Sequence, residues 1–354
     1  MRPNFAFYVH HHGSGHVMRA IAIASQLGEA NVSFLGSGLH AFTSLIPPHI
    51  TCYHLPSDIA RDEDEFSQLA ALDFLHYAPL NVRGLTDRSA VIADFFKKQF
   101  PVLLIVDVSV EVTMLAALCG IPALVIRQTG NRNDIPHLNA YQSAQTLIAP
   151  SPAALMNRSD FDWVEAKTFY SGGFSRFQGM QIDRPTVANT VAVMTGTGGT
   201  SIGPQLIEML AAEFPDKTFH ILGKMAQPFS GDYRNVVLHG NLENPAEILV
   251  SCETVIGNAG HNTVMEMADL NKRFICIYEE RPFDEQLHKA KLLEANNMAV
   301  VIAGDELSGA DWGDLFTKAA NLPPDRWKGV INPDALTDIA GALHDQWRKL
   351  FNAK

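Results

Sequence analysis

Two stretches decide the fold: residues 5–24 read FAFYVHHHGSGHVMRAIAIA, and residues 191–210 read VAVMTGTGGTSIGPQLIEML. In each, an apolar run typical of a buried strand leads into glycines and then into a helical pattern. The helical pattern that begins in the first stretch has the i, i+3, i+4, i+7 spacing of one buried helix face, which is formed by Val17, Ala20, Ile21, Ala24 and Leu27. A strand, a turn, a helix and a further strand predict a parallel sheet in each half.

Further apolar runs predict the other strands, and a gap between them predicts a domain boundary. The expected strands are 5–9, 32–35, 102–106, 123–126, 146–149, 187–194, 218–222, 236–239, 254–257, 274–277 and 299–302. The pattern lapses across the polar, glycine-containing segment 171–185. We therefore expect an N-terminal Rossmann-like domain at 1–172, a linker at 173–186 and a second Rossmann-like domain at 187–334. A C-terminal helix at 335–354 should pack back on the first domain.

The composition is that of a folded enzyme and excludes several classes of partner. The chain has 354 residues, of which 47% are hydrophobic and 18% charged, and its formal net charge is -11. This charge disfavours nucleic acid and broad adhesion to anionic lipid. The four cysteines form no CxxC pair and accompany apolar runs typical of a core, which favours a reducing compartment. With no signal peptide and no transmembrane run, we expect a cytoplasmic protein; peripheral membrane contact stays open.

The first glycine turn, 12–16, follows the first strand, where open α/β sheets bind their ligands. Gly13, Ser14 and Gly15 allow the backbone to approach a ligand closely. A dinucleotide fingerprint would need a third glycine where Met18 stands, so NAD fits poorly. His16 begins the helix, and its imidazole is a candidate general base, although a histidine that caps or lines the turn fits the spacing equally well.

The neighbouring histidines raise the question of a metal. His10, His11 and His12 are consecutive, and successive residues of a strand point to opposite faces. They are therefore not expected to share an ion, and we predict no metal site.

Asp107 follows the strand 102–106, whose carboxyl end should lie in the same crevice as His16. A carboxylate there can orient an imidazole and stabilise its protonated form. Glu111 is a competing candidate. The alternative is that Asp107 or Ser109 caps the helix that begins at Val110.

Two glycine-rich turns of the second half have the composition of phosphate-binding loops, because each leads into a helix start with free amides. The candidate ligands of the turn 195–200 are Thr195, Gly198, Gly199 and Thr200. Those of the segment 257–266, GNAGHNTVME, are Gly260, His261, Asn262 and Thr263.

Glu266 lies about one helical turn after Thr263, where its carboxylate can accept both ribose hydroxyls of a nucleotide. The same spacing fits a capping box. Asp284 and Gln286 follow the strand 274–277 and can read sugar hydroxyls, although an acidic helix start would look the same.

In this order, the motifs resemble the GT-B glycosyltransferases, especially the MurG-type family with its family 28 C-terminal half, over nearly the whole chain. The resemblance implies an α/β protein of the GT-B fold, with two Rossmann-like parallel sheets facing across a cleft. It also implies a metal-independent hexosyltransferase with no cofactor beyond a nucleotide-sugar co-substrate, a UDP-sugar. The implied roles are catalysis for His16 and Asp107, diphosphate binding for 198–200, α-phosphate binding for 260–263, ribose binding for Glu266, sugar contacts for Asp284 and Gln286, and base recognition for Gly240 and Leu242.

The chain departs from the MurG pattern after the first loop, where Gly15–Arg19, GHVMR, is closer to the UDP-sugar hydrolases of pseudaminic acid synthesis. Those related enzymes use water as the acceptor. Three functions stay open: transfer to a hydroxyl acceptor, hydrolysis of the nucleotide sugar, and non-catalytic binding of it. The acceptor itself is not identified. Its contacts are expected from the loops 57–66 and 127–134, in which Arg127 and Arg132 either hold an anionic acceptor or face solvent.

Overall fold

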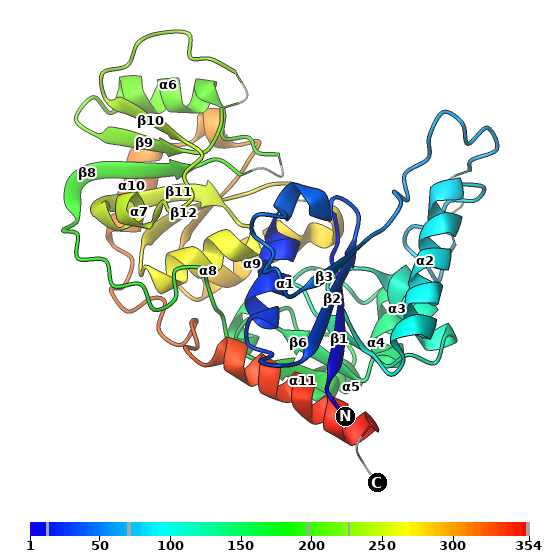
Figure 1. Cartoon of the computed structure of the whole chain (residues 1–354). Helices are drawn as coiled ribbons and strands as arrows, with labels where there is room; N and C mark the ends of the chain where they lie inside the picture. The colour runs from blue at the N-terminus through cyan, green and yellow to red at the C-terminus, as the bar shows by residue number, and fades with distance from the viewer. Residues whose placement is uncertain (12–13, 69–71, 197–198, 226, 352–354) are drawn as a thin grey trace.

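The chain forms two α/β units, each built on one parallel sheet (Figure 1). The computed structural model describes residues 1–11, 14–68, 72–196, 199–225 and 227–351. In the first sheet the strand order is β3-β2-β1-β4-β5-β6-β7, and all neighbouring strands run parallel. Its strands are β1 (Asn4–Tyr8), β2 (Asn31–Gly36), β3 (Thr51–His54), β4 (Leu103–Val106), β5 (Ala123–Ile126), β6 (Thr146–Ala149) and β7 (Thr168–Tyr170).

The second sheet has the order β10-β9-β8-β11-β12-β13 and is also parallel throughout. Its strands are β8 (Val187–Met194), β9 (Thr218–Leu222), β10 (Val236–Gly240), β11 (Cys252–Asn258), β12 (Arg273–Tyr278) and β13 (Val300–Ala303). Every strand expected from the sequence is present, with ends that differ by at most two residues. The short strands β3 and β7 were not expected.

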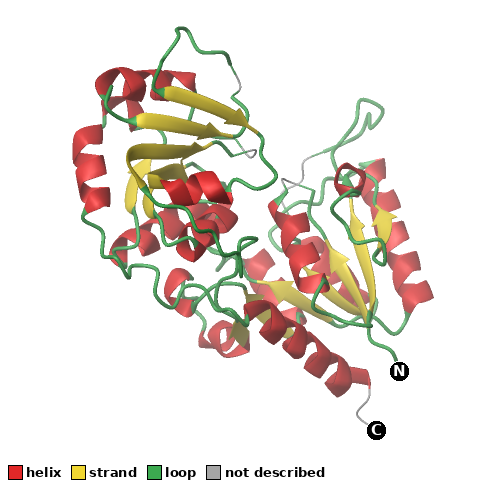
Figure 2. Cartoon of the chain, turned by 60° about the vertical axis from the view of Figure 1, so that its left-hand side comes forward, coloured by secondary structure: helices red, strands yellow, loops and turns green. Residues whose placement is uncertain are grey.

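Helices flank both sheets, as Figure 2 shows. In the first half they are α1 (Gly15–Ala24), α2 (Arg83–Gln99), α3 (Val110–Leu118), α4 (Ile135–Ser143) and α5 (Asp162–Lys167). In the second half they are α6 (Pro204–Glu213), α7 (Ala246–Ser251), α8 (His261–Asp269), α9 (Glu285–Ala295), α10 (Trp312–Ala320) and α11 (Ala335–Phe351). Within the described residues, none of these helices is both long and apolar enough to cross a bilayer.

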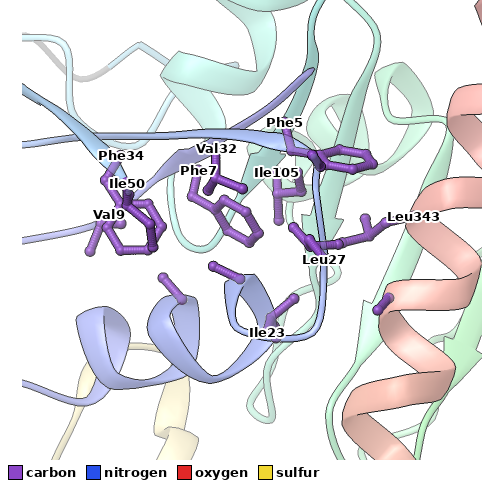
Figure 3. Close-up of a cluster of buried hydrophobic side chains, with 14 of the residues drawn as sticks. Phe5, Phe7, Val9, Ile23, Leu27, Val32, Phe34, Ile50, Ile105 and Leu343 are labelled. Atoms are coloured by element: carbon purple, nitrogen blue, oxygen red, sulfur yellow. The ribbon is translucent and has the colours of Figure 1, made fainter. Parts of the chain in front are cut away.

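The core of the first unit includes the last helix of the chain. Figure 3 shows Ile23 of α1 and Leu27, in the turn after that helix, facing the sheet, with Leu343 of α11 entering from the side. Trp347, also from α11, is 1% exposed and meets the ring of Phe5 edge-on at 5.9 Å. The apolar face of α11 is therefore buried against the first sheet, although the helix follows the second sheet in sequence.

The chain between β7 and β8 contains no helix or strand, and several contacts join the two units. The ammonium of Lys289 in α9 donates to the carbonyl of Leu155 at 2.8 Å. Asn157 lies 2.8 Å from the ring nitrogen Nδ1 of His288, and Arg132 lies 3.4 Å from the carboxylate of Glu285. These contacts hold α9 against the first unit.

The cysteines depart in part from the expectation of four core positions. Cys252 and Cys276 are buried, but Cys119 is exposed at the end of α3 and Cys52 is only half-buried. Cys119 follows the last residue of its helix, which places it at the surface.

Candidate functional site

The first part of the site lies where the order of the first sheet reverses. β1 and β4 are neighbours, with Tyr8 opposite Val106, and the chain leaves their carboxyl ends in different directions. Such switch points are where open α/β sheets bind ligands. His16 is the second residue of α1, which follows β1, and Asp107 comes directly after β4. The parallel pairing of the two strands therefore brings together residues that are 91 positions apart.

His16 and Asp107 form a close, largely buried pair. The Nδ1 atom of His16 lies 2.6 Å from Oδ2 of Asp107, which is 6% exposed. Arg19 donates to the other carboxylate oxygen from Nη2 at 2.7 Å and from Nε at 3.0 Å. Burial raises the pKa of Asp107, but the charges and hydrogen bonds of Arg19 and His16 outweigh it and lower the pKa to about 2. The carboxylate is therefore ionised and holds the Nδ1 proton of His16, which leaves Nε2 able to accept another.

Arg19 is the member of this cluster that the sequence interpretation missed. It lies three residues after His16, on the same face of α1, and that spacing was the available signal. Its guanidinium approaches the His16 ring to 3.2 Å and is 8% exposed.

The capping alternative is confirmed for Ser109 and wrong for Asp107, and Glu111 does not take the place of Asp107 beside His16. The cap of α3 is Ser109, whose hydroxyl accepts from the amide of Val112 at 3.1 Å, so Asp107 does not cap the helix. Glu111 also points elsewhere, because its carboxylate accepts from the backbone amides of His76 and Tyr77 at 2.8 and 2.9 Å.

In the second sheet, the loops after β8 and β11 occupy the corresponding switch point. Thr195 is unavailable to a phosphate through its hydroxyl, which donates to the carbonyls of Leu222 and Lys224 at 3.2 and 3.3 Å. The hydroxyl of Thr200 accepts from the amide of Ile202 at 3.0 Å. The helix α6 begins only at Pro204, so no helix start directly follows Thr200.

The glycines of this loop and of the first loop are described in part. Gly13 and Gly198, both predicted ligands, and His12 lie outside the described residues. Gly199 has a φ of 85° and its carbonyl accepts from the guanidinium of Arg281. A side chain at Gly199 would be strained in this left-handed conformation.

Glu279, which sequence reasoning did not single out, organises the same region. One of its carboxylate oxygens accepts from the amide of Ser201 at 2.7 Å, the hydroxyl of Ser201 at 2.8 Å and the side-chain amide of Asn258 at 2.9 Å. Gln286 accepts from the backbone amide of Glu279 at 2.9 Å. Gln286 therefore braces the loop end, while Asp284 is exposed and has a φ of 52°.

The start of α8 supplies the clearest anion-binding geometry. The helix runs from His261, and its N-cap is Gly260, which makes no side-chain cap. The first amides of the helix, at His261, Asn262 and Thr263, have no partner within the helix itself. The capping-box alternative is wrong, because Thr263 lies inside the helix rather than at its cap.

Glu266 is 6% exposed in the same helix and pairs with Arg176 of the interdomain segment, Nε to Oε1, at 2.9 Å. Burial raises its pKa although Arg176 lowers it. Of the residues expected at the nucleotide base, Gly240 ends β10 with a φ of 64°, and Leu242 is 39% exposed.

The two parts of the site face each other directly. A Cβ atom placed on Gly15 would lie 3.3 Å from Nδ2 of Asn262, so the starts of α1 and α8 are in near contact. Burial, followed by the charges of Lys289 and Arg19, holds the pKa of His261 well below its ordinary value, so this imidazole is neutral. The arrangement brings the residue before His16 against the side chain of Asn262 at the start of α8.

The prediction that His10 and His11 point to opposite faces of a strand is wrong. β1 ends at Tyr8, so His10 and His11 lie beyond the strand and do not point to opposite faces; their rings stack at 4.7 Å. Elsewhere in the described chain, His76, Asp134 and His137 bring three ligand atoms within 4.8 Å of one another.

Hydrogen bonds explain why the side chains of His76, Asp134 and His137 lie close together. Asp134 lies 2.6 Å from Nδ1 of His137 and 2.9 Å from Nε2 of His76, and Arg132 lies 2.9 Å from Nε2 of His137. With Arg132 donating to Nε2, Nδ1 of His137 carries the proton that Asp134 accepts. Burial and the charge of Arg132 lower the pKa of His137 to about 4, which keeps the ring neutral.

The two arginines considered for an anionic acceptor do not face solvent. Arg127 is 4% exposed and binds Glu165 at 2.7 Å and the hydroxyl of Tyr170 at 2.8 Å, which is a structural role. Arg132 lies over the ring of Phe283, 4.9 Å from its centroid.

Comparisons with known proteins agree with this architecture. Residues 190–315 match the family model of the glycosyltransferase family 28 C-terminal domain. The calicheamicin glycosyltransferase CalG4 is similar in structure with a TM-score of 0.71 and 15% identity, covering 99% of this chain and 100% of that one. MurG of Acinetobacter baumannii gives 0.65 and 16%, covering 97% and 100%. UGT89C1 of Arabidopsis thaliana, solved with UDP, gives 0.63 and 14%, covering 97% and 100%. No curated protein matches the chain.

Identities of 14 to 16% establish the fold, and the family model adds the type of the second domain. The expectation of two Rossmann-like parallel sheets is confirmed. The chain therefore has the GT-B fold of MurG-like glycosyltransferases, with a second domain of the family 28 C-terminal type.

Proposed function

We propose that the protein transfers a sugar from a UDP-sugar to a hydroxyl group, with His16 as the general base. The observation that carries this proposal is the buried cluster of His16, Asp107 and Arg19 beside the open start of α8. A candidate proton acceptor of one domain thus lies near a helix start of the other domain that is suited to bind an anion.

The chemistry follows from the hydrogen-bond directions. Asp107 holds the Nδ1 proton of His16, so Nε2 accepts the proton of the attacking hydroxyl. The hydroxyl oxygen forms a bond to the anomeric carbon as the bond from that carbon to the diphosphate breaks. The imidazolium that forms is stabilised by the ionised carboxylate. Arg19 keeps that carboxylate in place and ionised.

The leaving diphosphate carries the electron pair of the broken bond, and the second domain has groups suited to it. The amides at the start of α8 and the backbone around Gly199 and Thr200 would bind its oxygens. Well-placed donors of this kind contribute about 3–4 kcal/mol each to stabilising developing charge. UDP is the nucleotide we assign because UGT89C1, which shares this fold, was solved with UDP. Glu266 would then accept the ribose hydroxyls.

A UDP-sugar hydrolase is the second candidate, because Arg19 completes the Gly15–Arg19 segment that resembles such enzymes and is part of the base cluster. It would use the same base to activate water. Product analysis separates the two functions: a hydrolase releases free sugar from the UDP-sugar at full rate without any added acceptor.

The test is a measurement of UDP release from UDP-glucose and UDP-N-acetylglucosamine by wild type, His16→Ala and His40→Ala. His40 is an exposed histidine of the same domain and serves as the control. Loss of a general base lowers kcat by about 10²- to 10⁴-fold, so His16→Ala should fall in that range while binding UDP normally. Undiminished turnover in folded His16→Ala would remove His16 from the mechanism.

A further inference from the structure

A cavity of about 610 Å³ lies beside the base cluster; most of its lining comes from the first domain, and Pro282 and Phe283 of the second domain complete it. Asp107 and Val108 line it, together with His10, whose ring lies 5.6 Å from that of His16. A molecule in the cavity can therefore present a group at the base. The volume lies within the range of sites for drug-sized ligands and far exceeds the space that one water needs.

The walls of the cavity are mainly apolar. Aliphatic side chains from α2, α3 and β5 line it, namely Leu85, Ile92, Val110, Leu115 and Val125. Aromatic rings of Tyr77, Tyr141 and Phe283 also line it. Such walls favour a compact molecule that contains rings and disfavour a free sugar.

The charged side chains Arg88, Arg132 and Asp107 of the lining already form ion pairs, which argues for a neutral ligand. Arg88 binds Asp58 at 2.9 Å and the hydroxyl of Tyr8 at 2.9 Å. Arg132 lies near the carboxylate of Glu285 and over the ring of Phe283. A phosphate or carboxylate would have to displace these partners. A neutral molecule need not.

Two side-chain nitrogens of the lining, Nε of Arg88 and the amide nitrogen of Gln128, are buried without a hydrogen-bond partner among the described residues. Since the guanidinium of Arg88 is already paired with Asp58, Gln128 is the uncharged donor that a neutral ligand can use. A buried donor without a partner costs about 1–3 kcal/mol. An oxygen atom on the ligand would satisfy it.

Phe283 closes the cavity from the second domain. Its backbone has a φ of 61°, unusual for a bulky residue, and its carbonyl accepts from the amide of Asn131 at 2.8 Å. Its ring lies 5.0 Å from that of His76 and 4.7 Å from that of His137. The wall is therefore complete only when the turn at Pro282–Asp284, just before α9, lies against the first domain.

We propose that this cavity binds the sugar acceptor, and that the acceptor is a neutral ring compound with a hydroxyl at the base and a second oxygen at Gln128. This inference rests on the proposed function. The ligand hydroxyl gives its proton to His16 and its oxygen bonds to the anomeric carbon, while UDP departs with the electron pair. The cavity thus favours transfer over hydrolysis, since water needs no such walls.

The test is calorimetric titration of 17β-estradiol, a neutral ring compound with two hydroxyls, with and without UDP. Ser89→Trp places a bulky ring in the cavity, because Ser89 of α2 lines it. Ala90→Trp is the matched control, since the exposed Ala90 adjoins it but does not belong to the lining. N-acetylglucosamine and farnesyl pyrophosphate serve as polar and anionic comparison ligands.

We expect estradiol to bind wild type and Ala90→Trp alike, and Ser89→Trp at least about tenfold more weakly because the cavity is filled. UDP should bind all three equally. The proposal is overturned if estradiol does not bind wild type, if it binds Ser89→Trp as tightly, or if either comparison ligand is the one that Ser89→Trp excludes. Estradiol binding without any UDP binding would support the cavity assignment and refute the proposed function.

Discussion

Replacing Asp107 by Asn removes the negative charge between His16 and Arg19 while keeping the shape of the side chain. Two effects follow. His16 loses the anion that stabilises its protonated form, at a contact of 2.6 Å. Arg19, which is 8% exposed, loses its counter-ion and leaves its positive charge 3.2 Å from the His16 ring.

Both effects oppose protonation of His16 during the reaction, so they slow it together. A hydrogen bond to a charged group contributes about 1.5–3 kcal/mol. Since each 1.36 kcal/mol on the barrier is about tenfold in rate, the lost bond alone lowers kcat/KM by roughly 10- to 160-fold. The uncompensated charge of Arg19 adds to that loss. The double variant Asp107→Asn/Arg19→Gln should therefore turn over faster than Asp107→Asn.

The same substitution changes acid stability. The pKa of Asp107 is lowered from 3.8 to about 2 in the folded protein, which corresponds to about 2 kcal/mol of stability. Because the folded pKa is depressed, this contribution is present above pH 4 and is lost as the pH falls towards 2. Asp107→Asn should lack this part of the acid dependence, measured by urea unfolding between pH 5 and pH 3.

The kinetic assay is UDP release from a UDP-sugar, with the dissociation constant of UDP as a control that should not change. The reasoning is refuted if Asp107→Asn keeps kcat/KM within about threefold of wild type, since charge-assisted bonds contribute more than that. It is refuted equally if the double variant is slower than the single one.

Three other substitutions give separate expectations. Gly173→Ala should destabilise the fold by about 1–3 kcal/mol, because the new Cβ would lie 2.3 Å from the sulfur of Met265. Gly341→Ala should stabilise the fold, because this position in α11 has open space around it. Urea unfolding of the two variants measures both changes in the free energy of unfolding. Burial lowers the pKa of Lys289 from 10.5 to about 8, so the free energy of unfolding of wild type should rise by about 3 kcal/mol from pH 8 to pH 10.5. This rise should be smaller in Lys289→Met. An equal rise in the unfolding free energy of both proteins would contradict the prediction. Phe283→Ala should raise the KM for the acceptor by at least about tenfold, because it removes an aromatic wall of the cavity. The Tm and the KM for the UDP-sugar should change little. An unchanged KM for the acceptor would contradict the assignment of the cavity as the acceptor site.

The strands were predictable because parallel strands are buried on both faces and read as continuous apolar runs. β4 and β5, with all four residues buried in each, illustrate this. β3 and β7 were missed because they lie at the edges of the first sheet, where no residue is fully buried and the apolar signal is weak.

Part of the site could also be predicted from the sequence. His16 and Asp107 each follow a buried strand, and the carboxyl ends of parallel strands share one edge of a sheet. Arg19 was within reach through its i, i+3 spacing from His16. The helix start at Gly260 was visible as glycines after an apolar run, but the choice between a capping box and a free helix start depended on where α8 begins.

The sequence by itself determined the two sheets, the glycine turns at their switch points and the residue types available for chemistry, because these depend on local apolar patterns and backbone freedom. Only the tertiary structure decided the partners: Arg19 on Asp107, Arg176 on Glu266, and Phe283 in the cavity wall. Such contacts join residues from different elements, and the left-handed backbone at Phe283 is held by packing against the first domain. No local pattern records a contact whose geometry is set by the docking of two domains.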